Sequence, residues 1–109
     1  MAEASGQQQQ PTEELDYLDK MAESHAQNSA ALRPIHDKIA ALLPPFPPSA
    51  RVLDYGCGAG GISLLVAQNK LVQTVVAADI SAGMLKLLAD QLEKTPAEIA
   101  DKVEVLPPT

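Results

Sequence analysis

After residue 50 the hydrophobic residues of this chain fall into short runs separated by polar and glycine-rich segments. Nearly continuous apolar runs predict three strands, at 51–55, 72–78 and 103–106. Between them the apolar residues recur at helical spacing, in 62–68 and again after Ser81. Right-handed crossovers then place three parallel strands side by side in the order 3-2-1. The pattern predicts the α/β class: a partial, Rossmann-like open parallel sheet with N-terminal helices.

Finer features of this region can also be predicted. The run 72–78 is so uniformly apolar that we expect it to be covered on both faces of the sheet. Ser81 is expected to cap the following helix, whose inner side would carry Met84, Leu85, Leu88 and Leu92. The segment 95–98, Thr-Pro-Ala-Glu, has capping-box spacing and predicts one more short helical turn.

The N-terminal part has a different pattern, and it divides the chain into four segments. Residues 1–11 are polar and Gln-rich, which predicts a disordered tail. Residues 12–43 form a predicted helical segment, 44–49 a Pro-rich linker, and 50–109 a partial cofactor-binding domain. Within the helical segment, Thr12 would cap a first helix that runs to about Ala26. Pro34 would open a second helix, with an apolar stripe made of Leu32, Ile35, Ile39 and Leu42.

Composition narrows the classes of partner. The 109 residues carry a net charge of −6 and include only 3% aromatics. Without a basic face the chain lacks the driving force for binding phosphate backbones, so no nucleic-acid partner is indicated. No signal peptide is visible, and no run approaches the roughly 18 apolar residues of a membrane helix, so we expect a cytoplasmic protein with no membrane partner. With one cysteine, Cys57, and no ligand cluster, neither a disulfide nor a metal site is expected.

The sequence around the end of the first strand carries the candidate chemistry. Asp54-Tyr55-Gly56-Cys57-Gly58-Ala59-Gly60-Gly61 leads from that strand into a helix N-terminus, whose free N–H groups point toward a ligand. Asp79 ends the second strand, where a carboxylate can accept hydrogen bonds from a ribose diol. Because both features lie at the carboxyl edge of a parallel sheet, together they predict a nucleoside site.

Two cofactor classes use this geometry, and Asp54 distinguishes them. The spacing Gly56-x-Gly58-x-x-Gly61 satisfies the dinucleotide fingerprint, with Asp79 at about the right distance. However, an anion two residues before the first glycine would repel a pyrophosphate. It would instead attract a cofactor with a cationic amino-acid end, such as S-adenosylmethionine with its ammonium and sulfonium groups.

At this point the residues resemble a known family. The run 52–60 is similar to motif I of the class I S-adenosylmethionine-dependent methyltransferases, and 75–81 followed by Met84-Leu85 is similar to the next motif. The resemblance covers roughly residues 50–106 and implies S-adenosyl-L-methionine as cofactor. By similarity, Asp54, Gly56 and Gly58 would lie against the methionine part, Asp79 would bind the ribose hydroxyls, and Ile80 would lie against the adenine. The cofactor-binding residues that it implies are Asp54, Tyr55, Gly56, Cys57, Gly58, Gly60, Asp79, Ile80 and Met84.

The chain also departs from the family pattern. The family's sheet has seven strands, and only three can be made here. Pro107-Pro108-Thr109 stands where an acidic or amide residue that holds the adenine is expected, and the segment that often carries catalytic residues is absent. We therefore expect a truncated, cofactor-binding half with no assignable catalytic residue. The bare edge of strand one would then favour association with a partner or with a second copy, and would make the isolated chain aggregation-prone.

Three functions follow from these expectations. The first is an S-adenosylmethionine-dependent methyltransferase whose acceptor is unknown, with a small molecule favoured by the acidic composition. The second is a catalytically inactive fragment that binds a nucleoside or a partner. The third is an NAD-binding domain, which Asp54 disfavours.

The remaining reactive side chains have plainer interpretations. Cys57 has no neighbouring base in the sequence, so we interpret it as a small side chain packed in the loop rather than a nucleophile. His25 and His36 are interpreted as boundary histidines on helices, and Tyr17 as a packing residue. The acidic run 13–23 is interpreted as a solvated helix face.

Overall fold

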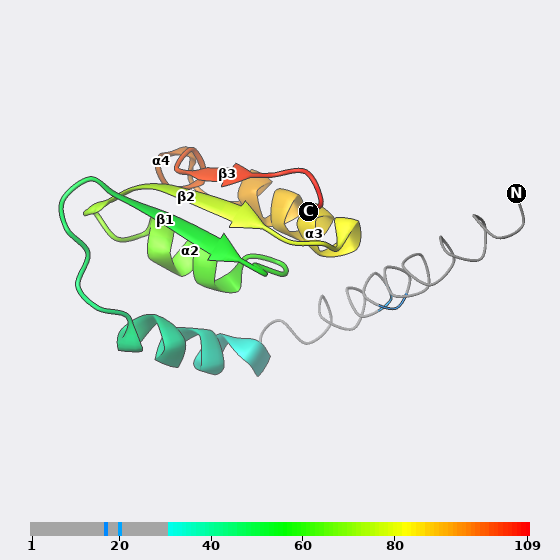
Figure 1. Ribbon diagram of the computed structural model, residues 1–109, viewed down its shortest axis with the longest axis horizontal. Coiled ribbons are helices and arrows are strands. Elements are labelled where there is room, and N and C mark those ends of the chain that lie inside the picture. The colour runs from blue at the N-terminus through cyan, green and yellow to red at the C-terminus, as the bar shows by residue number, and fades with distance from the viewer. Residues whose placement is uncertain (1–16, 18–19, 21–30) are drawn as a thin grey trace, which may run out of the picture.

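A computed structural model describes Tyr17, Lys20 and residues 31–109. Tyr17 and Lys20 are helical, and the rest of the predicted tail and first helix lies outside the described residues. A helix occupies residues 31–42. The elements that follow are β1 (Ala50–Tyr55), α2 (Gly61–Ala67), β2 (Val72–Ala78), α3 (Ala82–Glu93), α4 (Ala97–Ala100) and β3 (Val103–Val105) (Figure 1).

The three strands form one parallel sheet in the order β1-β2-β3. This is the predicted order 3-2-1 taken from the opposite edge, so the predicted topology is confirmed. Asp54 pairs with Ala77 and Tyr55 with Ala78, which brings the ends of β1 and β2 to the same edge of the sheet. Within the described residues β1 pairs on one side only.

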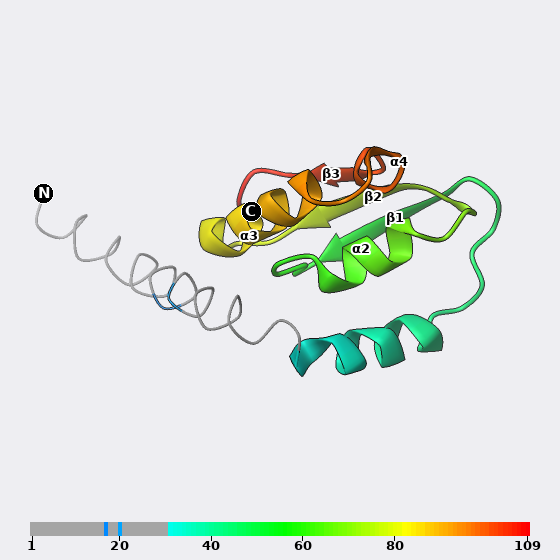
Figure 2. The same cartoon turned by 180° about the vertical axis from the view of Figure 1, so that it is seen from behind.

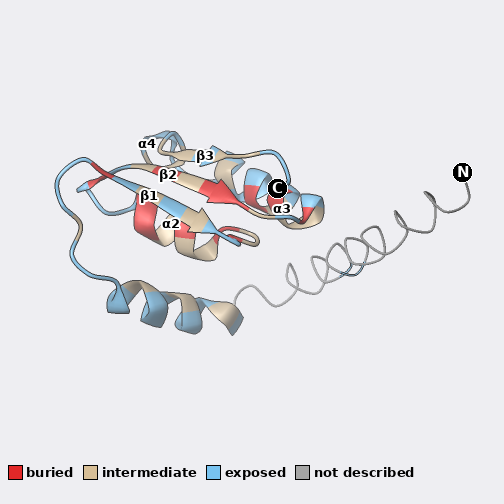
Figure 3. Cartoon of the chain, viewed as in Figure 1, coloured by how far each residue is buried: buried red, intermediate tan, exposed pale blue. Residues whose placement is uncertain are grey.

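The helices α2, α3 and α4 cover a single face of the sheet. Val75 and Ala77 lie two positions apart on β2 and therefore on the same face of the sheet. Both are fully buried against residues of these helices. Figure 1 views the sheet from its uncovered face, and Figure 2 views it from the side of the helices. On the uncovered face of β1, Leu53 is 63% and Tyr55 77% exposed (Figure 3). The expectation that β2 is covered on both faces is therefore wrong for the described residues, because an apolar run records burial but not which layers supply it.

The helix over residues 31–42 packs with a different face from the predicted one. Its half-buried positions follow an i, i+4 row, Leu32, His36 and Ala40. Ile35 and Leu42 of the predicted stripe are 56% and 78% exposed. The helix also already includes residues 31–33, so Pro34 does not open it. The predicted stripe is wrong because His36, a polar residue, makes the close contact with α2.

Two of the three predicted helix caps lie within the described residues, and they have opposite outcomes; Thr12 lies outside them. The Ser81 hydroxyl accepts a hydrogen bond from the Met84 N–H at 3.1 Å, which confirms the cap of α3. In α4 the N-cap is Pro96, and no side chain caps the helix. Thr95 instead donates its hydroxyl hydrogen to the Gln91 carbonyl at 2.7 Å, one turn back. The predicted short helical turn is confirmed as α4. Its predicted cap is wrong, because the threonine bonds to the end of the preceding helix.

A lysine fastens the short third strand to the rest of the fold. The Lys102 ammonium, next to β3, donates to the carbonyl oxygens of Ala67 and Asn69 at 3.1 and 3.2 Å. These carbonyls lie at the carboxyl end of α2, where a cation is favourable. Across the described part of the chain, no helix has both the length and the apolar character that crossing a membrane requires.

Candidate functional site

The predicted glycine loop lies where the sheet meets the helices, at the carboxyl ends of β1 and β2. Gly56, Gly58 and Gly60 have φ angles of 80°, 56° and 86°, in the left-handed region that other residues rarely adopt. Gly60 is also the N-cap of α2, and the Leu64 N–H donates to its carbonyl at 2.9 Å. Three left-handed residues within five positions fold the chain back tightly between β1 and α2.

The glycines of the loop have two different surroundings. A Cβ added to Gly56 or Gly58 would meet nothing within 4 Å. A Cβ on Gly60 would overlap the Leu88 side chain of α3, and one on Gly61 would overlap the His36 ring. Gly56 and Gly58 therefore line open space, whereas Gly60 and Gly61 let neighbouring helices approach closely. The structure places Gly60, a predicted cofactor residue, on the packed side of the loop.

Asp79 joins the loop to the start of α3. Its Oδ2 accepts a hydrogen bond from the Gly58 N–H at 2.8 Å, and its Oδ1 accepts one from the Ser81 N–H at 2.9 Å. Each carboxylate oxygen has two lone pairs, so both oxygens can accept further hydrogen bonds. Asp79 is half-buried and beside the open glycines, at the place that the sequence predicts for a ribose ligand.

Asp54 is held by a residue that the sequence interpretation missed. Ser63, on the first turn of α2, is fully buried and donates its hydroxyl hydrogen to Asp54 Oδ2 at 2.7 Å. The signal was present in the sequence, because Ser63 is the one polar residue in the run from Ile62 to Ala67. A lone hydroxyl on the buried face of an apolar helix requires a partner.

Cys57 lies near both carboxylates, and the surroundings of its thiol disfavour the reactive thiolate. Its side chain is buried, and its thiol donates to the Gly58 carbonyl at 3.4 Å. Burial, followed by the charges of Asp54 and Asp79, raises the pKa of the Cys57 thiol to about 11. A thiol that stays protonated at neutral pH supports the interpretation of Cys57 as a packing residue. Because Asp54 and Asp79 both contribute to the raised pKa of Cys57, both carboxylates lie close enough to act electrostatically on the loop.

The loop N–H groups already have acceptors within the chain. Gly56 N–H and Cys57 N–H both donate to the Ala78 carbonyl, at 2.7 and 2.9 Å. Gly58 N–H donates to Asp79, and Gly60 N–H donates to the Cys57 carbonyl at 3.0 Å. A phosphate-binding loop presents such N–H groups to its ligand, whereas these four N–H groups are already bound within the chain.

The other predicted cofactor residues lie at the margins of the site. Ile80 is 53% exposed and directly follows Asp79. Met84 is half-buried on the first turn of α3. Tyr55 belongs to the uncovered face of the sheet, opposite Asp54. The backbone N–H of Thr109 donates to the Asp79 carbonyl oxygen at 2.9 Å, so residues after β3 run past the same edge.

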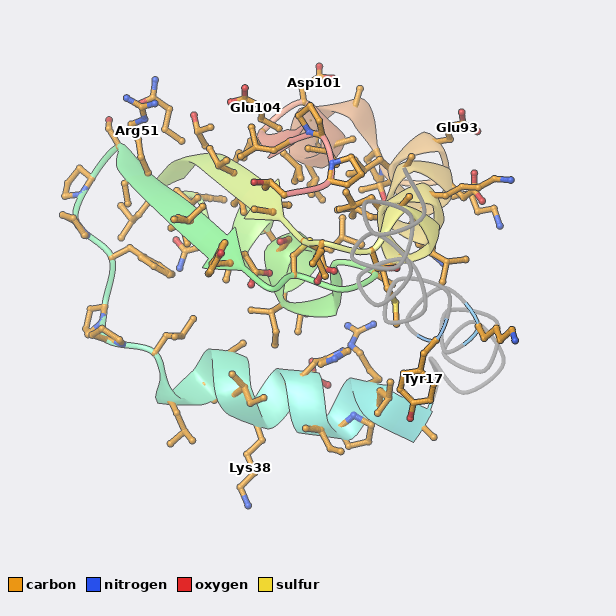
Figure 4. The ribbon with its side chains drawn as sticks, turned by 45° about the vertical axis from the view of Figure 1, so that its right-hand side comes forward. Tyr17, Lys38, Arg51, Glu93, Asp101 and Glu104 are labelled. Atoms are coloured by element: carbon orange, nitrogen blue, oxygen red, sulfur yellow. The ribbon has the colours of Figure 1, made fainter. Side chains whose placement is uncertain are left out.

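Other features of the structure lie apart from the open side of the loop. A cavity of about 800 Å³ is bounded by the helix 31–42, α2, α3 and α4, and its lining includes His36, Leu64, Leu87 and Lys94. Asp54 and Asp79 do not line it. In the side-chain view, Glu93, Asp101 and Glu104 point outward from the periphery (Figure 4). His36 is half-buried on Gly61, and His25 lies outside the described residues.

Comparisons with known proteins identify the family and the fold of the chain. The family described as "Methyltransferase domain" matches residues 23–106. The methyltransferase domain of bacterial CtHen1 has a similar structure, with a TM-score of 0.55 and 20% identity over 68% of this chain and 38% of that one. Phosphoethanolamine N-methyltransferase 1 of Haemonchus contortus, solved with phosphoethanolamine and S-adenosylhomocysteine, gives a TM-score of 0.59 and 14% identity over 84% of this chain.

The matches differ in how much of each protein they cover. The chain spans 38% and 21% of the length of these two structures. At such low identities the structures establish the fold, and the family match rests on the sequence itself. No curated protein sequence is significantly similar to the chain. The family match extends over most of the chain and takes in both predicted motifs, so the chain belongs to the methyltransferase-domain family and its resemblance to the class I methyltransferases is confirmed.

Proposed function

We propose that the chain binds S-adenosyl-L-methionine at the open side of the glycine loop and serves as the cofactor-holding part of a methyltransferase. One observation carries the proposal: two carboxylates, Asp54 and Asp79, flank a stretch of backbone where Gly56 and Gly58 leave space for a ligand. An anionic site with an open backbone suits a nucleoside cofactor whose other end is cationic.

The chain's own residues fit this group. Asp79 retains lone pairs for ribose hydroxyls, and Ile80 offers an exposed apolar surface for the base. Asp54 supplies a negative charge for the ammonium of the amino-acid end. When bound, the cofactor supplies an activated methyl group on a sulfonium, and these residues hold it in a fixed orientation, the main contribution that a methyltransferase makes.

The arrangement of donors argues against NAD. A dinucleotide loop binds pyrophosphate through free backbone N–H groups at a helix N-terminus. Here the N–H groups of Gly56, Cys57, Gly58 and Gly60 all donate within the chain. A pyrophosphate on this loop would lack those four donors, would be left with the first N–H groups of α2, and would face two carboxylates.

The methyl acceptor is proposed to be a small molecule. A net charge of −6 gives no attraction to a nucleic-acid backbone. The described residues do not offer an identifiable general base beside the loop, so catalytic residues are not assigned.

Isothermal titration calorimetry with S-adenosylmethionine, S-adenosylhomocysteine and NAD tests the cofactor. We expect both sulfur nucleosides to bind. NAD should bind at least about tenfold more weakly, because the two carboxylates repel its pyrophosphate; a tenfold difference in Kd corresponds to about 1.4 kcal/mol. NAD binding equal to or tighter than S-adenosylmethionine binding would contradict the proposal.

Asp79→Asn tests the ribose contact, because it keeps the shape of the side chain and removes its charge. Hydrogen bonds to a charged group contribute about 1.5–3 kcal/mol, so affinity should fall roughly 10- to 150-fold. Asp90→Asn, at an exposed position on α3, is the matched control and should leave affinity unchanged. Unchanged affinity in Asp79→Asn would refute the ribose role.

A second function remains distinguishable by assay. Cofactor binding without transfer to any of a panel of amine, hydroxyl and thiol acceptors would favour an inactive nucleoside-binding protein. Transfer to one of them would favour the enzyme.

A further inference from the structure

We infer that Ser63 is a positioning residue that orients the Asp54 carboxylate toward the cationic amino-acid end of the cofactor. The inference rests on the proposed function and extends it to a residue that does not itself contact the ligand. Its basis is the hydrogen bond from the Ser63 hydroxyl to Asp54 Oδ2, 2.7 Å long.

The surroundings of Ser63 make this hydroxyl a fixed donor. Ser63 is fully buried at the third position of α2, and its neighbours along the helix are apolar. Burial and the helix backbone together restrict its rotamers. A distance of 2.7 Å is typical of a hydroxyl that donates to a charged carboxylate, a stronger bond than one between neutral groups.

Asp54 depends on this donor more than Asp79 depends on any side chain. Asp79 is held by two backbone N–H groups, which only a substitution by proline could remove. Asp54 is held by a side chain from the next element, and it lies at the end of β1 with its carboxylate on the side of α2. Ser63 is therefore the point at which the orientation of one carboxylate, and only one, can be changed.

The consequence concerns one end of the ligand. If Ser63 fixes Asp54, loss of its hydroxyl weakens binding of ligands that carry the amino-acid group. It leaves binding of the nucleoside end unchanged, because that end is bound by Asp79 and its backbone partners. 5′-Methylthioadenosine, which lacks the amino-acid group, is the probe for that end.

An isosteric pair of variants provides the test. Ser63→Thr keeps the hydroxyl, and Ser63→Val has the same shape without it. Titration calorimetry on the full chain should show Ser63→Val binding S-adenosylhomocysteine about fivefold to twentyfold more weakly than Ser63→Thr, consistent with loss of a hydrogen bond to a charge. The two variants should bind 5′-methylthioadenosine within about twofold of each other. Equal loss for both ligands, or no difference for either, would overturn the inference.

A double-mutant cycle covers the case in which the β-branched variants do not fold. Ser63→Ala alone should reduce S-adenosylhomocysteine affinity, while Ser63→Ala combined with Asp54→Asn should be no weaker than Asp54→Asn alone. Additive losses would overturn the inference. Val66→Ala, which truncates a buried side chain on the same helix, controls for general destabilisation. It should leave the ratio of the affinities for S-adenosylhomocysteine and 5′-methylthioadenosine unchanged.

The two proposals fail in different ways. If the wild-type chain binds none of these nucleosides, the proposed function fails. If the wild-type chain binds them and the hydroxyl has no selective effect on the amino-acid ligand, only the role of Ser63 fails.

Discussion

The glycine loop has an open half and a packed half, and comparing them separates two reasons for the same residue. At Gly56 and Gly58 a side chain would enter empty space beside the carboxylates. At Gly60 and Gly61 it would collide with Leu88 and His36. The sequence motif does not distinguish these glycines, but only Gly56 and Gly58 face the proposed cofactor site. In the packed half, glycine allows two helices to approach the start of α2.

Gly60→Ala should cause the largest loss of stability, because it combines a left-handed backbone with a collision. We expect a loss of about 2–5 kcal/mol, from a strained φ and an overpacked core. Chemical denaturation followed by circular dichroism measures it. Since Leu88 is fully buried, its side chain has little room to move away.

Leu88→Ala provides the control for that collision. The double variant Gly60→Ala/Leu88→Ala should lose less stability than the sum of the two single losses, because the added methyl group enters the space left by leucine. Additive losses would show that backbone strain alone explains the effect.

Cys57 lies between Gly56 and Gly58 in the sequence, but its side chain belongs to the same buried cluster as Leu88. The pKa of its thiol therefore depends on burial as well as on the nearby carboxylates. Because its pKa is raised from 9.0 to about 11, the thiolate fraction at pH 8 should be roughly a hundredfold below that of a free cysteine. Alkylation by iodoacetamide should be slowed to that extent in the folded chain and restored in urea.

The same shift sets the sign of a pH effect on stability. A thiol that holds its proton more tightly when folded stabilises the fold below pH 9, and this contribution is lost as the pH rises from 9 toward about 11. Cys57→Ser should flatten that part of the stability profile. Fast alkylation at pH 8 in the native state would contradict the burial of the thiol.

Gly58→Ala should affect binding more than stability. The left-handed φ costs about 1–2 kcal/mol, but the added methyl group enters the space proposed for the cofactor and should reduce affinity at least about tenfold. Calorimetry beside a denaturation curve separates the two effects. Gly60→Ala, corrected for its unfolded fraction, should retain more affinity than Gly58→Ala, and the reverse order would break the comparison.

Gly61→Ala should have the smallest effect. Its backbone is helical, where alanine is favoured by about 0.5–1 kcal/mol, and the half-buried His36 ring can rotate away. We expect a net change in stability within about 1 kcal/mol. With His36→Ala as background the same change should become stabilising, and a loss there would mean that the collision lies elsewhere.

The sequence predicted the elements and the loop because these depend on local pattern. Strand β2 was predicted with its observed bounds, Val72–Ala78, and Ser81 was predicted as the N-cap that α3 has. The glycine spacing and Asp79 predicted a candidate site at this edge of the sheet, and the structure joins the two there through the hydrogen bond from Gly58 to Asp79. The individual ligand contacts remain predictions.

Features that depend on distant parts of the chain were not predictable. Gly60 lies close to Leu88, and Gly61 lies close to His36. In both pairs the two residues belong to different elements that are distant in the sequence, so no local sequence pattern predicts these contacts. For the same reason the helix over 31–42 packs with its His36 face rather than with its most apolar face. Among the described residues no second layer covers β2. The apolar run did not predict this, because a parallel strand in a one-sided sheet can be as apolar as one in a two-sided sheet.

The lysine beside β3 has a consequence for how the fold opens. With only three residues in β3, this strand would be the first to unzip, yet Lys102 ties it to the final carbonyls of α2. Detachment of the strand then exposes the helix terminus as well, so both should open as one cooperative unit. Amide hydrogens of Val105 and Asn69 should therefore exchange with similar protection, although Asn69 lies before β2 and Val105 lies in β3.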